Sequence, residues 1–331
     1  MVPMKYSLTF LVITFLYASF VAAQNYKNTN DQQNGKTFGQ LMTWVFDGEK
    51  GPERVEIETS TQWQELAPDQ TNYAVWIGHA TYLINNGDIN ILTDPIFSKR
   101  ASPIGFAGPK RMIPAVMSLS DLPKIDLVVV SHNHYDHLDI WSLRKLNKLN
   151  PKTIFLVPIG DGKKLTRSGI KNVYEMNWWD EFSHSETTFS FTPVQHWSKR
   201  GLFDRNKSLW GGWFMQTKEL SLYHAGDTGY SSDFKTTYER LGAPDYSFIP
   251  IGAYDPRWFM KDSHVNPEEA VQIALDLKTP HSFGMHWGTF ILTDEPILEP
   301  PARLEEALKE QNLAPDFFTS PKPGQILQLT K

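Results

Sequence analysis

Short apolar runs of strand length recur along the 331-residue chain, with turn-forming residues between them. The run at 80–94 contains Asn86-Gly87, the strongest short signal for a hairpin turn, so two antiparallel strands are expected there. The remaining strands are predicted within residues 72–78, 125–131, 153–158, 172–177, 187–194, 211–217, 220–227 and 246–252.

Helical segments lie between or after these runs. They are predicted within residues 138–150, 160–169, 231–242, 266–277 and 299–311. Pro267 and Pro301 would stand in the first turns of the last two, where proline is tolerated. Early strands followed by alternating strands and helices favour an α/β fold with helices outside the sheets. Because the composition does not break, one domain is expected over residues 51–331.

The N-terminus has the pattern of a secretory signal. Lys5 precedes an apolar stretch at 8–20, and small residues follow, so residues 1–23 are predicted to be a signal peptide. An uncleaved membrane anchor is the alternative, although the stretch is shorter than the roughly 20 residues that a spanning helix needs. Residues 24–50 are predicted to be a flexible polar lead-in. We expect an exported protein, periplasmic or secreted, which is membrane-associated if the segment is retained.

Charge and cysteine content narrow the function classes. The 32 basic and 37 acidic residues give a net charge of -5, and the basic residues are scattered, which argues against nucleic-acid binding. The absence of cysteine excludes disulfides and a lipid anchor on cysteine. One local basic cluster, at Lys99, Arg100, Lys110 and Arg111, is either a solvated loop or a contact for lipid phosphates.

The segment SHNHYDHLD, residues 131–139, places imidazoles and carboxylates in one turn directly after an apolar strand. His132, His134, Asp136 and His137 leave the end of that strand toward one small volume. An ordinary core has no use for such a cluster, whereas zinc and related metals bind imidazole and carboxylate well. The segment therefore predicts a metal site.

Hydrolytic sites commonly hold two ions, and two ions need more ligands than this turn supplies. His196, Asp227 and His286 each follow a strand-like run and have small or turn-forming neighbours. Ligands on loops above a sheet are expected in such places. These three residues are therefore the candidates for the remaining ligands.

The ordered set of motifs resembles the metallo-β-lactamase superfamily and, within it, the N-acylphosphatidylethanolamine phospholipase D group. The segments that carry the resemblance are WIGHATYLI (76–84), TDPIFSKRASP (93–103), GPKR (108–111), SHNHYDHLD (131–139), HWSKR (196–200), GDTGY (226–230), HVNPEEAV (264–271) and HWGTF (286–290). The resemblance implies an αββα sandwich of two mixed sheets with helices on the outer faces, and a site for two zinc ions at one edge of the sheets.

The resemblance also implies a division of the ligands. His132, His134 and His196 would hold the first zinc ion, Asp136, His137 and His286 the second, and Asp227 would bridge both. His264 would lie at the active site outside the ligand shell and donate a hydrogen bond to a phosphoryl oxygen or to the leaving group, or else cap a surface helix. His79, Asp94 and His224 are candidates to support the ligands, with a structural role as the alternative for each.

The activity implied is hydrolysis of N-acylphosphatidylethanolamine to N-acylethanolamine and phosphatidic acid by a hydroxide that bridges the metals. The partner would be a phospholipid at a membrane surface, which suits the eleven tryptophans of the chain, and the resembling family includes homodimers. Two alternatives remain open: a metal-dependent lactonase or other ester hydrolase of the same superfamily, and a non-catalytic lipid-binding protein on the same fold.

Overall fold

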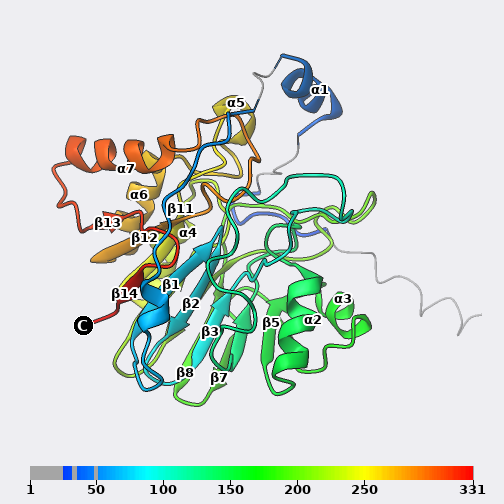
Figure 1. Ribbon diagram of the computed structural model, residues 1–331. Helices are drawn as coiled ribbons and strands as arrows, with labels where there is room; N and C mark the ends of the chain where they lie inside the picture. The colour runs from blue at the N-terminus through cyan, green and yellow to red at the C-terminus, as the bar shows by residue number, and fades with distance from the viewer. Residues whose placement is uncertain (1–24, 32–35, 48–50, 331) are drawn as a thin grey trace, which may run out of the picture.

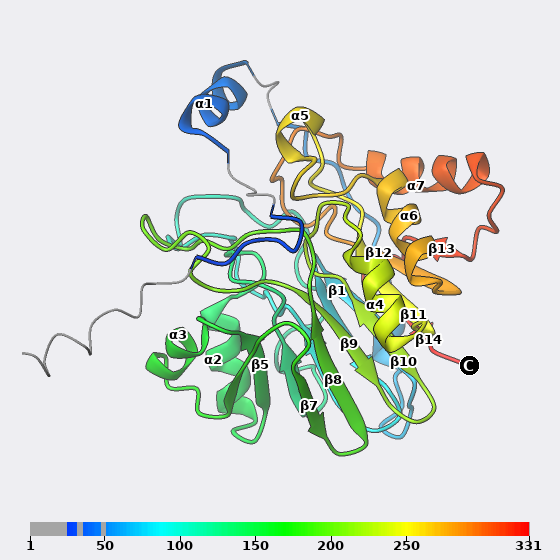
Figure 2. The ribbon, with the colours of Figure 1, turned by 180° about the vertical axis from the view of Figure 1, so that it is seen from behind.

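The computed structural model describes residues 25–31, 36–47 and 51–330. Two seven-stranded sheets pack face to face, and helices cover their outer faces (Figures 1 and 2). The αββα sandwich predicted from the sequence is thereby confirmed. The signal peptide predicted at residues 1–23 lies outside the described residues.

The two sheets follow the same plan, three antiparallel strand pairs and then three parallel ones. The first has the order β14 (Ile326–Gln328), β1 (Tyr73–Gly78), β2 (Thr81–Asn85), β3 (Asn90–Thr93), β4 (Leu127–Val129), β5 (Ile154–Pro158) and β6 (Val173–Met176). The second has the order β7 (Glu181–His184), β8 (Thr187–Thr192), β9 (Gly212–Gln216), β10 (Ser221–His224), β11 (Tyr246–Pro250), β12 (His281–Met285) and β13 (Phe318–Thr319).

The helices divide between the two outer faces (Figure 1). The first sheet is covered by α2 (Ile140–Leu149) and α3 (Gly162–Arg167), and the second by α4 (Asp233–Leu241), α6 (Pro267–Leu277) and α7 (Glu299–Glu310). Shorter elements are η1 (Gln62–Glu65) and α5 (Arg257–Met260), and α1 (Phe38–Asp47) stands apart from the sandwich. In α6, Asn266 accepts a hydrogen bond from Glu269 N and Pro267 opens the helix, as the sequence predicted.

The core lies mainly between the sheets, where aromatic side chains such as Trp76, Tyr82, Trp213 and Phe248 are fully buried. A second cluster packs α2 against the outer face of the first sheet. Because strands such as β1, β4 and β5 are buried on both faces, their sequences are almost continuously apolar. Within the described ranges, no helix is long and apolar enough to cross a bilayer.

The lead-in predicted over residues 24–50 is partly built into the domain. Tyr26 N donates to Asn206 O at 2.8 Å, Thr29 Oγ1 donates to Asp233 at 2.6 Å, and α1 falls within the same stretch. These contacts join residues 25–31 to the domain. Packing of Tyr26 against the core adds to these hydrogen bonds.

Candidate metal centre

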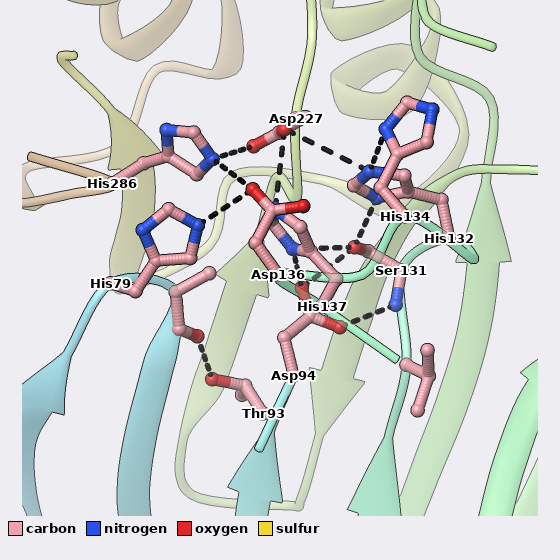
Figure 3. Close-up of polar contacts among 12 residues, drawn as sticks. His79, Thr93, Asp94, Ser131, His132, His134, Asp136, His137, Asp227 and His286 are labelled. Carbon is pink, nitrogen blue, oxygen red and sulfur yellow. Dashed lines mark hydrogen bonds and ion pairs between the residues drawn. The ribbon is translucent and has the colours of Figure 1, made fainter. Parts of the chain in front are cut away.

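The candidate ligands meet at one edge of the sandwich, because each of their loops leaves a strand at that edge. Asp94 follows β3, residues 131–137 follow β4, and Asp227 lies three residues beyond β10. His286 directly follows β12, and His196 comes four residues after β8. The carboxyl ends of neighbouring parallel strands open on the same side of a sheet, so residues far apart in the chain converge there (Figure 3).

The first group consists of His132, His134, His196 and Asp227, whose ligand atoms all lie within 4.8 Å of one another. His132 Nε2 is 2.8 Å from His134 Nδ1, and His196 Nε2 is 3.2 Å from the same atom. These are the first three ligands that the sequence indicated, together with the proposed bridging aspartate.

Hydrogen bonds on the far sides of the rings fix the tautomers in this group. His196 Nδ1 donates to Ser263 O at 2.9 Å, and His132 Nδ1 lies 2.9 Å from Ser131 Oγ, whose proton goes to Asp94. The Nε2 atoms of both rings therefore carry lone pairs, and His134 can donate to one of them at most. Converging lone pairs repel unless a cation lies between them, so the first group fits a metal ion.

The second group consists of His79, Asp136, His137 and His286, again within 4.8 Å. His137 Nδ1 donates to Asp94 at 2.9 Å and its Nε2 lies 3.2 Å from Asp227 Oδ2. Among the described residues, neither ring nitrogen of His286 has a hydrogen-bond partner, although its Nε2 lies 3.0 Å from Asp227 Oδ1. Asp227 Oδ2 also lies 3.8 Å from His132 Nε2 and 3.9 Å from His196 Nε2 of the first group, so this carboxylate lies between the two groups.

The protonation states suit metal binding in the first group. Burial lowers the pKa of His134 to about 4 and holds the pKa of His132 and His196 well below the ordinary value, so all three are neutral ligands. Burial alone would raise the pKa of Asp227, but the charges of His137 and His286 and the polar contacts of both rings together outweigh it and lower that pKa well below the usual range. The carboxylate of Asp227 is therefore ionised.

The second group holds protons that a metal must displace. Burial would lower the pKa of His286, but Asp227 and Asp136 more than compensate and raise it to about 9. The same two carboxylates, with Asp94, raise the pKa of His137 well above its ordinary value. A divalent ion entering this group has to release these protons, so its affinity falls as the pH falls.

Asp94 supports the ligands from beneath and is fully buried. Its Oδ1 accepts from Ser131 N at 2.7 Å, and its Oδ2 accepts from Ser131 Oγ at 2.6 Å, His137 Nδ1 at 2.9 Å and His224 Nε2 at 3.0 Å. His224 therefore reaches the site only through Asp94. Ser131, which the sequence did not single out, lies between Asp94 and His132 and orients the His132 ring.

The other candidates border the two groups. His79 Nε2 donates to Asp136 Oδ2 at 2.9 Å, and its ring lies 4.0 Å from that of His286. His264 lies beside Asp227, with its Nδ1 3.8 Å from Oδ2, and its side chain is 16% exposed whereas that of His286 is 0% exposed. His264 is thus partly open to solvent, as His134 is in the first group, whereas His286 is not.

Asn28 is a further member of the site that lies in the predicted lead-in. Its Oδ1 accepts from the backbone N of His196 and from Trp210 Nε1, each at 3.0 Å, and the residue is 4% exposed. The N-terminal segment thereby holds the loop after β8 that carries the candidate ligand His196. No metal-site pattern surrounds this asparagine, so only its contacts assign it a role.

We predict that Asp94→Asn weakens metal binding by about 10- to 100-fold, because the amide cannot replace a carboxylate that accepts from His137, His224 and Ser131 together. Zinc titration of the folded protein measures the effect. Asp88→Asn is the matched control, since Asp88 also accepts three hydrogen bonds but at the β2–β3 hairpin. Unchanged zinc affinity in the Asp94 variant would contradict the role.

We predict that Asn28→Ala lowers the free energy of unfolding by about 1–3 kcal/mol, because the buried backbone N of His196 loses this acceptor and Trp210 Nε1 keeps only Val194 O of its two acceptors. Zinc affinity should fall as well, since His196 loses its backbone anchor. Chemical denaturation and zinc titration measure the two effects, and Lys27→Ala, at an exposed neighbour, serves as the control. If both variants behave alike, Asn28 has no part in the site.

Comparisons with known proteins agree with this geometry. The family model described as the beta-lactamase superfamily domain matches residues 89–287. The N-acyl-phosphatidylethanolamine-hydrolyzing phospholipase D 1 of Caenorhabditis elegans is 41% identical over 266 residues, which cover 77% of this chain and 75% of that protein. The mitochondrial enzyme of the same name from Saccharomyces cerevisiae is 40% identical over 243 residues, 70% of this chain and 51% of that protein.

Among solved structures, Igni18, a metallo hydrolase from the archaeon Ignicoccus hospitalis, shares the fold with a TM-score of 0.58 at 20% identity. The match covers 77% of this chain and 97% of that one. Fold, family model and relatives agree with one another, and the non-catalytic alternative loses its support. The chain belongs to the β-lactamase superfamily and is one of its metal-dependent hydrolases.

Proposed function

We propose that this protein is a zinc-dependent phospholipase D that hydrolyses N-acylphosphatidylethanolamine to N-acylethanolamine and phosphatidic acid. The observation that carries the proposal is the 41% identity to an enzyme named for this reaction, over three quarters of both chains. The ligand geometry supports the metal requirement, because Asp227 lies between two groups of converging imidazoles.

The proposed reaction adds water across one phosphorus–oxygen bond. The water oxygen joins phosphorus, the bond to the ethanolamine oxygen breaks, and a proton ends on the departing oxygen. Two zinc ions, when bound, would supply an acidified water near neutral pH and offset the charge of the phosphoryl oxygens. His132, His134 and His196 would hold one ion, Asp136, His137 and His286 the other, and Asp227 would span both.

His264 has the position and the charge state of a hydrogen-bond donor to the substrate. Burial lowers its pKa to about 4, more than Asp227 raises it, so the ring is neutral and carries one N–H. It lies at the more open side of Asp227, within reach of a phosphoryl group held there. We assign it the donation of a hydrogen bond to a phosphoryl oxygen or to the departing oxygen.

The proposal also includes export of the protein from the cytoplasm. Its support is the sequence of residues 1–23, which has the order of a signal peptide, and the polar segment that follows. The cysteine-free chain can fold outside the cytoplasm without any disulfide pairing.

We predict that the zinc-loaded protein releases N-acylethanolamine and phosphatidic acid from N-acylphosphatidylethanolamine, measured by mass spectrometry of the lipid products. Asp227→Asn should show no product above background, because the amide cannot bridge two ions. Turnover of acyl lactones with no turnover of the phospholipid would replace the proposed substrate while leaving the metal site intact.

We predict that His264→Gln lowers kcat by about 10²- to 10⁴-fold, the range expected for a group that assists proton transfer or charge stabilisation. The zinc content should stay that of the wild type, which elemental analysis measures. Loss of one zinc ion per chain would show that His264 is a metal ligand, since a ligand atom of its ring also lies within 4.8 Å of those of Asp227 and His286. Full turnover would remove it from the mechanism.

A further inference from the structure

Two loops beside the metal centre expose apolar side chains at their tips. They are residues 97–111 and 197–207, which we call the tip loops. Phe203 is 85% exposed, and Phe106 and Leu202 are each 84% exposed, more than any other large apolar side chain of the described residues. Water-exposed phenylalanine and leucine on separate loops add nothing to the core, so they indicate a binding surface.

The tip loops lie side by side. In Figures 1 and 2 they project together from the same corner of the sandwich. A groove runs between the first tip loop and residues 135–141, which begin in the metal-binding turn, and Arg200 of the second tip loop also lines it. The exposed tips therefore stand next to the active site.

The tip loops are also strongly basic. They hold eight Lys and Arg residues and one Asp, although the whole chain has a net charge of -5. Arg111 and Arg200 are used internally, since each donates to backbone carbonyls. Lys99, Lys110 and Lys207 are exposed, and no carboxylate of the described residues forms an ion pair with them.

Arg200 attaches the second tip loop firmly to the metal centre. Its guanidinium stacks 3.9 Å from the Tyr135 ring and donates to Asn133 O at 2.8 Å and Leu138 O at 2.7 Å. Tyr135 returns a hydrogen bond to Arg200 O at 2.9 Å. A surface that binds Leu202 and Phe203 is consequently held at a fixed distance from the residues that would bind metal.

We propose that the tip loops dock this protein on an anionic lipid surface, with Phe106, Leu202 and Phe203 in the interface and Lys99, Lys110 and Lys207 at the lipid phosphates. Lysine is depleted in the cores of protein interfaces, whereas basic residues beside apolar tips suit anionic membranes. A second copy would bring like charges together. The inference rests on the proposed function, since it places a membrane-resident phospholipid beside the catalytic groups.

The test is sedimentation of the full zinc-loaded chain with vesicles, which needs no turnover. Binding to phosphatidylcholine vesicles that contain phosphatidylglycerol should exceed binding to pure phosphatidylcholine. Phe106→Ser/Leu202→Ser/Phe203→Ser should lower partitioning by roughly tenfold or more. Leu149→Ser, at an exposed leucine near the far end of α2, is the matched control and should bind like the wild type.

A second set of variants tests the contribution of the three lysines to vesicle binding. Lys99→Gln/Lys110→Gln/Lys207→Gln should weaken binding to anionic vesicles by roughly fivefold per lysine and leave binding to neutral vesicles unchanged. Lys218→Gln, in the turn between β9 and β10 at the opposite end of the sheet, is the control.

Two results would overturn the proposal: no binding of the wild type to either vesicle, or equal binding by the wild type and the triple serine variant. Self-association that the serine substitutions abolish would assign the tip loops to a second copy instead. Absence of phospholipid hydrolysis by a protein that still binds vesicles would refute the proposed function alone. Turnover of detergent-dispersed substrate should be equal in the wild type and the serine variant.

Discussion

The buried carboxylate of Asp94 is the interaction on which the rest of the site depends. It lies at the end of β3 in the first sheet and accepts hydrogen bonds from Ser131 and His137, which follow β4, and from His224 of β10 in the second sheet. One side chain thus connects both layers of the sandwich at the edge where the ligands converge. Its desolvation would be costly without these donors, which hold its pKa below the usual range.

The order and direction of the strands bring the candidate ligands together above Asp94. Both sheets change from antiparallel to parallel pairing, at β3 and at β10, and the loops after β3, β4, β10 and β12 open on the same edge. His132 and His196 donate through Nδ1 to Ser131 and to Ser263 O, so each directs its Nε2 toward the centre of the first group. The protein therefore directs several lone pairs into one volume, as a metal ion requires, and it holds them at rigid strand ends.

Much of this could be predicted from the sequence. The histidines and aspartates at 131–137 are dense enough to indicate a metal site from the sequence alone. The other candidates, His196, Asp227 and His286, share a position after strand-like runs. Asn28, Ser131 and Ser263 could not be found in this way, because asparagine, serine and a backbone carbonyl serve many purposes and only their contacts define their role. Short strands were missed for a related reason: β13 and β14 pair two or three residues and carry too little periodicity to predict a strand.

The central claim is that Asp227 lies between two metal ions. Anomalous diffraction from crystals of the zinc-loaded protein, recorded on both sides of the zinc absorption edge, tests it most directly. The account predicts two zinc peaks about 3.5–4 Å apart, one beside His132, His134 and His196 and the other beside His137 and His286, with Asp227 between them. A single peak, or two peaks of which neither touches Asp227, would contradict it.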